Sequence, residues 1–71
     1  MDQETFNLSI RQFLKMVGIN SQREIEHAVE KALADGSLSG SESLKAKMTL
    51  ELPGVKLKVD FDGEIKLERG T

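Results

Sequence analysis

Apolar residues in the first part of the chain recur every three or four positions, which is the spacing of one face of an α-helix. The first such series is Phe6, Ile10, Phe13, Leu14 and Val17. This spacing predicts a helix over residues 3–17, with Asp2 as its N-cap. Gly18 follows directly and predicts the end of that helix, because glycine readily adopts the left-handed conformation of a C-cap.

A second helix is expected to start after this glycine. Ser21 and Glu24 have the spacing of a capping box, in which a serine hydroxyl and a glutamate carboxylate satisfy free backbone N–H groups. A further helical apolar series follows: Ile25, Ala28, Val29, Ala32 and Leu33. The pattern therefore predicts a helix over residues 22–35, and Gly36 is its expected stop.

From Leu44 onward the period changes from about 3.6 to 2, which indicates β-strands with one buried face. The alternation predicts strands over residues 44–52, 55–61 and 64–68. Pro53-Gly54 is expected to form the first turn and Asp62-Gly63 the second, with Gly63 in a left-handed, bulged conformation.

Paired residues of neighbouring strands must share a face, and this parity restricts the register. In the first hairpin it favours Leu50 opposite Leu57 and Glu51 opposite Lys56. On the same grounds, Lys47 is expected opposite Asp60. In the second hairpin it sets Lys58 opposite Lys66, an unfavourable pair of like charges.

Together these elements predict an α+β fold of the order ααβββ. A helical hairpin would pack on one face of a three-stranded antiparallel β-meander, within a single small domain covering residues 1–71. The last residues, 69–71, are expected to fray.

The amino-acid composition limits the classes of function that this chain can have. The 71 residues contain no cysteine and carry a formal net charge of −2. Disulfides and thiolate zinc sites are therefore excluded, and there is no overall electrostatic attraction to phosphate backbones. The start of the chain lacks a basic segment followed by an apolar run, and no stretch is apolar enough to span a membrane. We expect a cytoplasmic location.

A resemblance to a known family rests mainly on five segments in the N-terminal half of the chain. These segments are Phe6-Asn7-Leu8-Ser9-Ile10-Arg11, Phe13-Leu14-Lys15, Val17-Gly18, Ser21-Gln22-Arg23-Glu24-Ile25-Glu26 and Ala28-Val29. With the later glycines and the alternation from Leu44 to Leu67, this pattern resembles a family of small uncharacterised bacterial proteins of about 70 residues. The resemblance implies a bacterial origin and supplies no activity or site residue.

No cluster of residues predicts catalysis, a cofactor or a metal. His27 is the only histidine, and its nearest potential co-ligands are Glu24, Glu26 and Glu30, a weak set for zinc. The acidic residues Asp60, Asp62 and Glu64 surround the expected second turn but lack the spacing of a calcium loop. We therefore expect no enzyme, no metal and no cofactor.

Five lysines are expected to project from the open face of the sheet: Lys45, Lys47, Lys56, Lys58 and Lys66. This basic face makes weak nucleic-acid or anion binding the alternative function. Sheets that bind single-stranded RNA combine such charges with exposed aromatic rings. The open face has none, and it also carries acidic residues, so a solvated surface is the favoured interpretation.

Two apolar residues do not fit the first helical face. Leu8 lies nearly opposite it and Met16 lies well off it, with Gln12 between them. These three residues are the candidate interaction surface. The function we expect is a non-enzymatic protein-interaction or accessory module, with a protein partner or a homodimer contact at this surface and strand addition at the open sheet edges as a second route.

Overall fold

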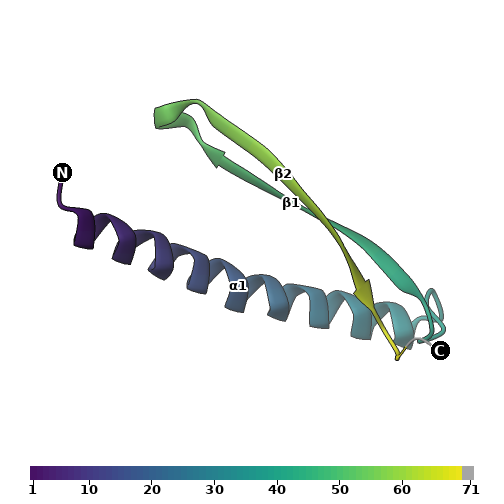
Figure 1. Cartoon of the computed structure of the whole chain (residues 1–71). Coiled ribbons are helices and arrows are strands. Elements are labelled where there is room, and N and C mark those ends of the chain that lie inside the picture. Colours follow the sequence, from purple (N-terminus) through teal and green to yellow (C-terminus); the bar gives the residue numbers. More distant parts are fainter. Residues whose placement is uncertain (70–71) are drawn as a thin grey trace. The chain divides into compact units, whose positions relative to one another are not determined.

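The computed structural model describes residues 1–69 and contains one helix and one β-hairpin (Figure 1). The helix α1 spans Gln3–Ala34. The strands β1, Ser43–Leu52, and β2, Leu57–Lys66, are joined by a short 3₁₀ turn η1, Pro53–Val55. The contacts divide the chain into two compact units, one from Met1 to Ser37 and the other from Leu38 onward. The expected fraying of residues 69–71 falls partly on Gly70 and Thr71, which lie outside the described residues.

The predicted helical hairpin is wrong, because residues 3–17 and 22–35 form one uninterrupted helix. Gly18 has no positive φ angle and does not act as a C-cap. The apolar positions explain the continuity, since Leu14 and Ile25 are eleven residues apart, three helical turns, and so are Val17 and Ala28. A helix that continues through Gly18 therefore keeps these positions on one face.

Both true ends of α1 agree with the sequence prediction. The carboxylate of Asp2 accepts hydrogen bonds from the backbone N–H groups of Glu4, at 3.1 Å, and Thr5, at 3.4 Å, which is the N-cap arrangement. After Ala34, Gly36 has φ +84°, and its N–H donates to the carbonyl of Leu33. Glycine at this left-handed position stops the helix as expected.

The connecting segment is ordered by carboxylates. Glu42 accepts hydrogen bonds from the backbone N–H groups of Ser39, at 2.8 Å, and Gly40, at 2.9 Å. The bond from Ser39 is the main cause that lowers the pKa of Glu42 from its ordinary value of 4.5. Asp35 is held similarly by Ser37, whose hydroxyl lowers the pKa of that carboxyl.

These lowered pKa values predict how the connecting segment responds to acid. A depressed pKa means that Glu42 stabilises the fold fully above its unfolded pKa, and that this stabilisation is lost as the pH falls through the folded pKa. We expect the amide resonances of Ser39 and Gly40 to titrate together with the Glu42 carboxyl, with a midpoint below 4.5. In Glu42→Gln these amide shifts should no longer titrate at that midpoint. A Glu42 midpoint at or above 4.5 would contradict the hydrogen-bond arrangement.

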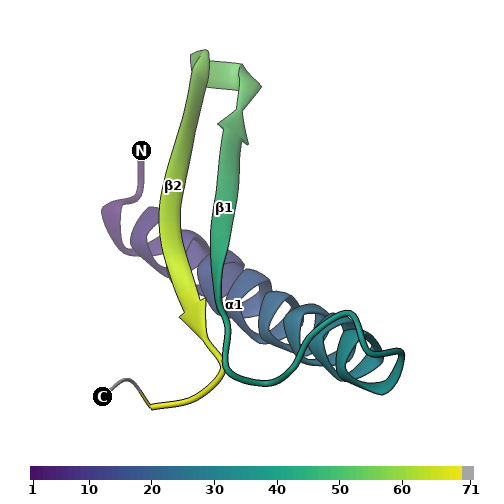
Figure 2. The same ribbon diagram turned by 90° about the vertical axis from the view of Figure 1, so that its right-hand side faces the viewer.

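The three-stranded meander is also wrong. The predicted strands 55–61 and 64–68 correspond to one strand, β2, which pairs with β1 along its whole length (Figure 2). Asp62 pairs with Lys47 and Gly63 with Ala46, and Gly63 is not left-handed. Turning at Asp62-Gly63 would have left half of β1 without a hydrogen-bonded partner.

The register differs from the prediction by two residues but keeps the predicted faces. Leu50 lies opposite Val59 instead of Leu57, and Glu51 lies opposite Lys58 instead of Lys56. The shift arises because the turn occupies residues 53–56, and Lys56 itself takes the left-handed conformation with φ 57°. Since the shift is even, every side chain keeps its face.

Candidate interaction surfaces

The hairpin has one face made entirely of apolar residues and glycine. Direct partners of an antiparallel ladder share a face, and five such pairs alternate along β1 and β2. We call them the hairpin face: Leu44 with Ile65, Ala46 with Gly63, Met48 with Phe61, Leu50 with Val59, and Leu52 with Leu57. Phe61 remains 56% exposed and Met48 45%. Apart from Gly63, which was expected in a turn, these positions are the ones that the alternation predicts on the buried face of the strands.

The other side of the hairpin is polar and balanced in charge. Its direct pairs are Ser43 with Lys66, Lys45 with Glu64, Lys47 with Asp62, Thr49 with Asp60, and Glu51 with Lys58. Four lysines therefore share this side with four carboxylates. The predicted opposition of Lys58 to Lys66 is wrong, because each of them faces a residue of β1.

Short contacts link these side chains across the strands. The Nζ atom of Lys47 lies 4.0 Å from Oδ2 of Asp60, and Nζ of Lys58 lies 4.0 Å from Oε1 of Glu51. The hydroxyl of Thr49 donates to Asp60 at 2.7 Å. Such exposed ion pairs contribute little to stability. Their main effect is to neutralise the lysines locally, while Lys56, the fifth residue of the expected basic face, lies in the turn.

The helix α1 carries apolar side chains on two sides in its N-terminal half. One side, which we call the Phe6 face, holds the predicted series: Phe6, Ile10, Phe13, Leu14 and Val17. Each residue advances the helix by about 100°, so that Leu8, Gln12, Met16 and Ile19 gather on roughly the opposite side. We call this second set the Leu8 face. Its apolar members are about half exposed: Leu8 55%, Met16 49% and Ile19 50%.

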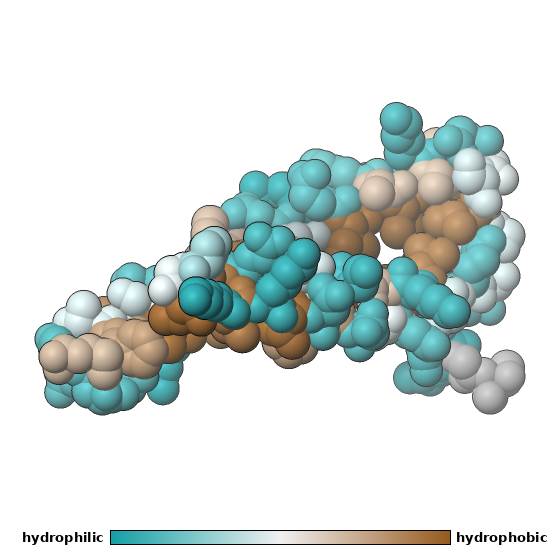
Figure 3. Space-filling model, turned by 90° about the horizontal axis from the view of Figure 1, so that it is seen from above, coloured by the Kyte–Doolittle hydropathy of each residue, from teal (hydrophilic) through white to brown (hydrophobic). Residues whose placement is uncertain are grey.

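The structure thus brings together the three residues predicted as an interaction surface and adds Ile19 to them. Ile19 lies beyond the predicted helix end at Gly18, and only the continuous helix adds it to this face. The signal that would have found it is its spacing, since Leu8, Gln12, Met16 and Ile19 follow each other by four, four and three residues. On the side of the molecule that Figure 3 shows, hydrophobic residues, coloured brown, also reach the surface.

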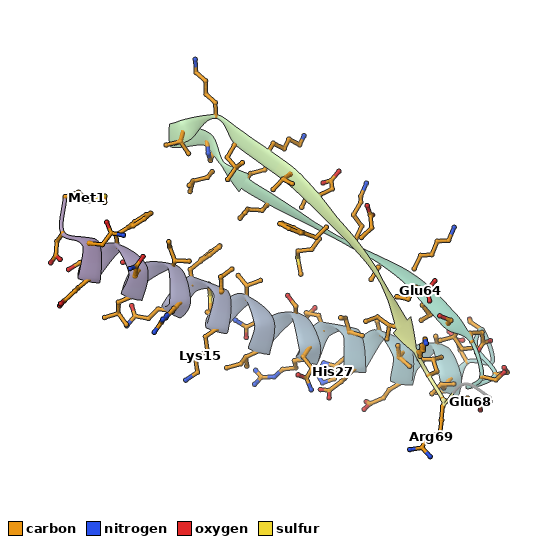
Figure 4. The ribbon with its side chains drawn as sticks, viewed as in Figure 1. Met1, Lys15, His27, Glu64, Glu68 and Arg69 are labelled. Carbon is orange, nitrogen blue, oxygen red and sulfur yellow. The ribbon has the colours of Figure 1, made fainter. Side chains whose placement is uncertain are left out.

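The remaining candidates for chemistry lie on different elements. His27 projects from α1 and Glu64 belongs to β2 (Figure 4). Over residues 1–69, no three His, Asp or Glu side chains are close enough to hold a metal ion. An open hollow of about 450 Å³ lies beside the small pair Ala46 and Gly63. Its remaining lining is Lys45, Asp62 and Glu64. These exposed, oppositely charged groups define no enclosed reaction site.

In the part of the chain that the structure describes, no helix is long and apolar enough to cross a membrane. No curated protein and no solved structure matches the chain. A family model does match, over residues 1–68, almost the whole sequence. The resemblance seen in the sequence is thereby confirmed at the level of the family: the chain belongs to the family of unknown function DUF6494.

Proposed function

We propose that this protein is a non-enzymatic interaction module that completes its fold against another polypeptide. The proposal rests on the number of apolar faces in the chain. The chain has two compact units but three apolar faces: the Phe6 face, the Leu8 face and the hairpin face. Packing within one chain can pair at most two of these three faces. At least one remains for another chain.

The stability of the separate elements supports the same conclusion. None of the residues 1–69 is fully buried. An isolated two-stranded hairpin is marginally stable in water, because it cannot bury its apolar face. Most helical stability in proteins likewise comes from packing of an apolar face rather than from intrinsic propensity. Burial of the apolar faces against a partner would supply the stabilisation that the helix and the hairpin lack on their own.

Binding of nucleic acid or of another anion through the lysines is less well supported. Four of the five lysines share their face with four carboxylates, and the apolar aromatic residue of β2, Phe61, lies on the other side of the hairpin. Binding to phosphates would show a steep loss of affinity with salt. The proposal therefore expects no shift of the protein with single-stranded RNA or DNA at low ionic strength.

The decisive experiment is thermal unfolding of the purified chain, followed by far-UV circular dichroism over a 100-fold range of protein concentration. We expect the midpoint to rise with concentration, or the chain to unfold over a broad, weakly cooperative range when it is alone. Sedimentation equilibrium on the same samples gives the mass. A monomer that unfolds cooperatively at a midpoint independent of concentration would overturn the proposal.

The cellular setting belongs to this proposal as well. We place the module in the cytoplasm of a bacterium, in keeping with the family resemblance and with a chain that has no cysteine for disulfides. Detection of the native protein in the cytosolic fraction of a source cell checks this location.

A further inference from the structure

The Leu8 face is confined to the first part of α1. Beyond Ile19 the same side of the helix becomes charged, since Arg23, Glu26 and Glu30 continue its spacing. The Phe6 side differs, because apolar positions continue there through Ile25 and Ala28. A partner on the Leu8 face therefore contacts about four helical turns, from Thr5 to Ile19, and no more.

The order of residues on this face is nearly symmetric about Gln12. Leu8 and Met16 lie four residues before and after it. Thr5 and Ile19 follow at seven residues on either side. An antiparallel pair of such helices related by a two-fold axis sets each residue against its mirror position in the other copy. Leu8 then packs on Met16, and Thr5 packs on Ile19.

We propose that the occupant of the Leu8 face is a second copy of this chain, docked antiparallel with Gln12 of both copies at the two-fold axis. This inference rests on the proposed function and gives that interaction module its partner. The result is an isologous helix pair formed by the N-terminal halves of two α1 helices.

Gln12 favours a second copy over a purely apolar partner. A side-chain amide has both a donor and an acceptor. Two Gln12 side chains meeting at the axis can therefore satisfy one another. An apolar surface over the same position would leave the amide without hydrogen-bond partners, which opposes binding.

Charge favours the antiparallel direction. The N-terminal end of α1 is acidic, with the N-cap Asp2 and with Glu4 in the first turn, and Arg23 follows the apolar part of the Leu8 face. Antiparallel docking about Gln12 brings Arg23 of one copy close to the acidic first turn of the other. Parallel docking would instead place the two Arg23 side chains together, and like charges in contact disfavour association.

Cysteine cross-linking tests the direction directly, because the natural chain contains no cysteine. Leu8→Cys and Met16→Cys are prepared as separate single variants, one carrying a size tag, and are mixed before mild oxidation. The antiparallel pair predicts disulfides mainly between the two different variants, since only these positions face each other. Disulfides mainly within each variant would overturn the antiparallel arrangement.

Sedimentation equilibrium tests the surface itself. Leu8→Glu should raise the dimer dissociation constant at least about 100-fold, because loss of a buried leucine costs roughly tenfold and occurs twice in a two-fold dimer. His27→Glu is the matched control, because it adds the same charge to α1 two turns beyond Ile19. We expect its dissociation constant to stay within about threefold of the natural one, as for surface substitutions outside the contact.

The outcomes separate this inference from the function on which it rests. If Leu8→Glu dimerises as well as the natural chain, the Leu8 face is not the contact, although the chain still associates. If the natural chain stays monomeric and weakly folded, the homodimer is excluded while a different protein partner remains required. Only a monomer that unfolds cooperatively, at a midpoint independent of protein concentration, would contradict both the homodimer and the proposed interaction module.

Discussion

Replacing Gly18 by proline is expected to lower the free energy of unfolding by about 3 kcal/mol or more, whereas replacing it by alanine should raise it by about 1 kcal/mol. Gly18 lies in the interior of α1, where proline removes a backbone hydrogen bond and its ring clashes with the carbonyl of Leu14. Alanine keeps the helix geometry and removes the entropic penalty of glycine. A Cβ atom at this position meets no atom of the chain within 4 Å.

Urea denaturation followed at 222 nm measures both changes at one fixed protein concentration. The alanine variant is the more informative of the two. An uninterrupted helix predicts that alanine stabilises the protein, whereas a helical hairpin predicts that it destabilises it. If Gly18 were the left-handed cap of a helical hairpin, alanine would destabilise the protein by a similar amount. A destabilised alanine variant would therefore contradict the uninterrupted helix, or show that a partner's backbone contacts Gly18 closely.

The error at Gly18 shows how local signals mislead in a chain without a large core. Gly18 and the Ser21 to Glu24 capping box each indicate a helix end, but such signals are worth only about 1 kcal/mol each. Ending the helix at residue 17 would leave the last backbone carbonyls to find new partners. The signals at Asp2 and Gly36 predicted the ends correctly, because no apolar series continues beyond them in phase.

The prediction of a second turn was wrong for a related reason. Asp-Gly is a common hairpin sequence, and it suggested a turn at residues 62 and 63. The competing element is β1, which at ten residues is long enough to pair with an unbroken β2. Alternation of side chains continues through Gly63 without a change of face, because glycine occupies an apolar position opposite Ala46. Parity predicted the faces correctly, whereas the turn alone decided the register.

The candidate interaction surface itself stays a prediction, but the helix that carries its three residues was predicted correctly at these positions. Leu8, Gln12 and Met16 lie within the correctly predicted part of α1, so that their positions did not depend on what happens at Gly18. Ile19 was missed because its position did depend on Gly18: the predicted helix ended before it. The hairpin face was predicted correctly except at Gly63, which was expected in a turn, and at Val55, which was expected on this face but lies in η1. That another element covers this face stays a prediction.

The role of the hairpin face can be tested at its largest side chain. We expect Phe61→Ala to lower the free energy of unfolding of the associated protein by about 3 kcal/mol, as for phenylalanines that are enclosed in a core. Phe61 is 56% exposed in the chain, and that exposure alone would make the substitution nearly neutral. The large expected effect therefore comes from whatever covers this face.

Lys58→Ala is the matched control, since Lys58 lies on the polar side of the same strand and its ion pair with Glu51 is exposed. Its effect should stay within about 0.5 kcal/mol. Both variants are compared by urea denaturation at equal protein concentration, well above that needed for association. If Phe61→Ala costs no more than Lys58→Ala, the hairpin face remains in water in the associated protein, and the helix alone provides the contact. A large difference means that this face is covered there, either by the chain's own helix or by the partner.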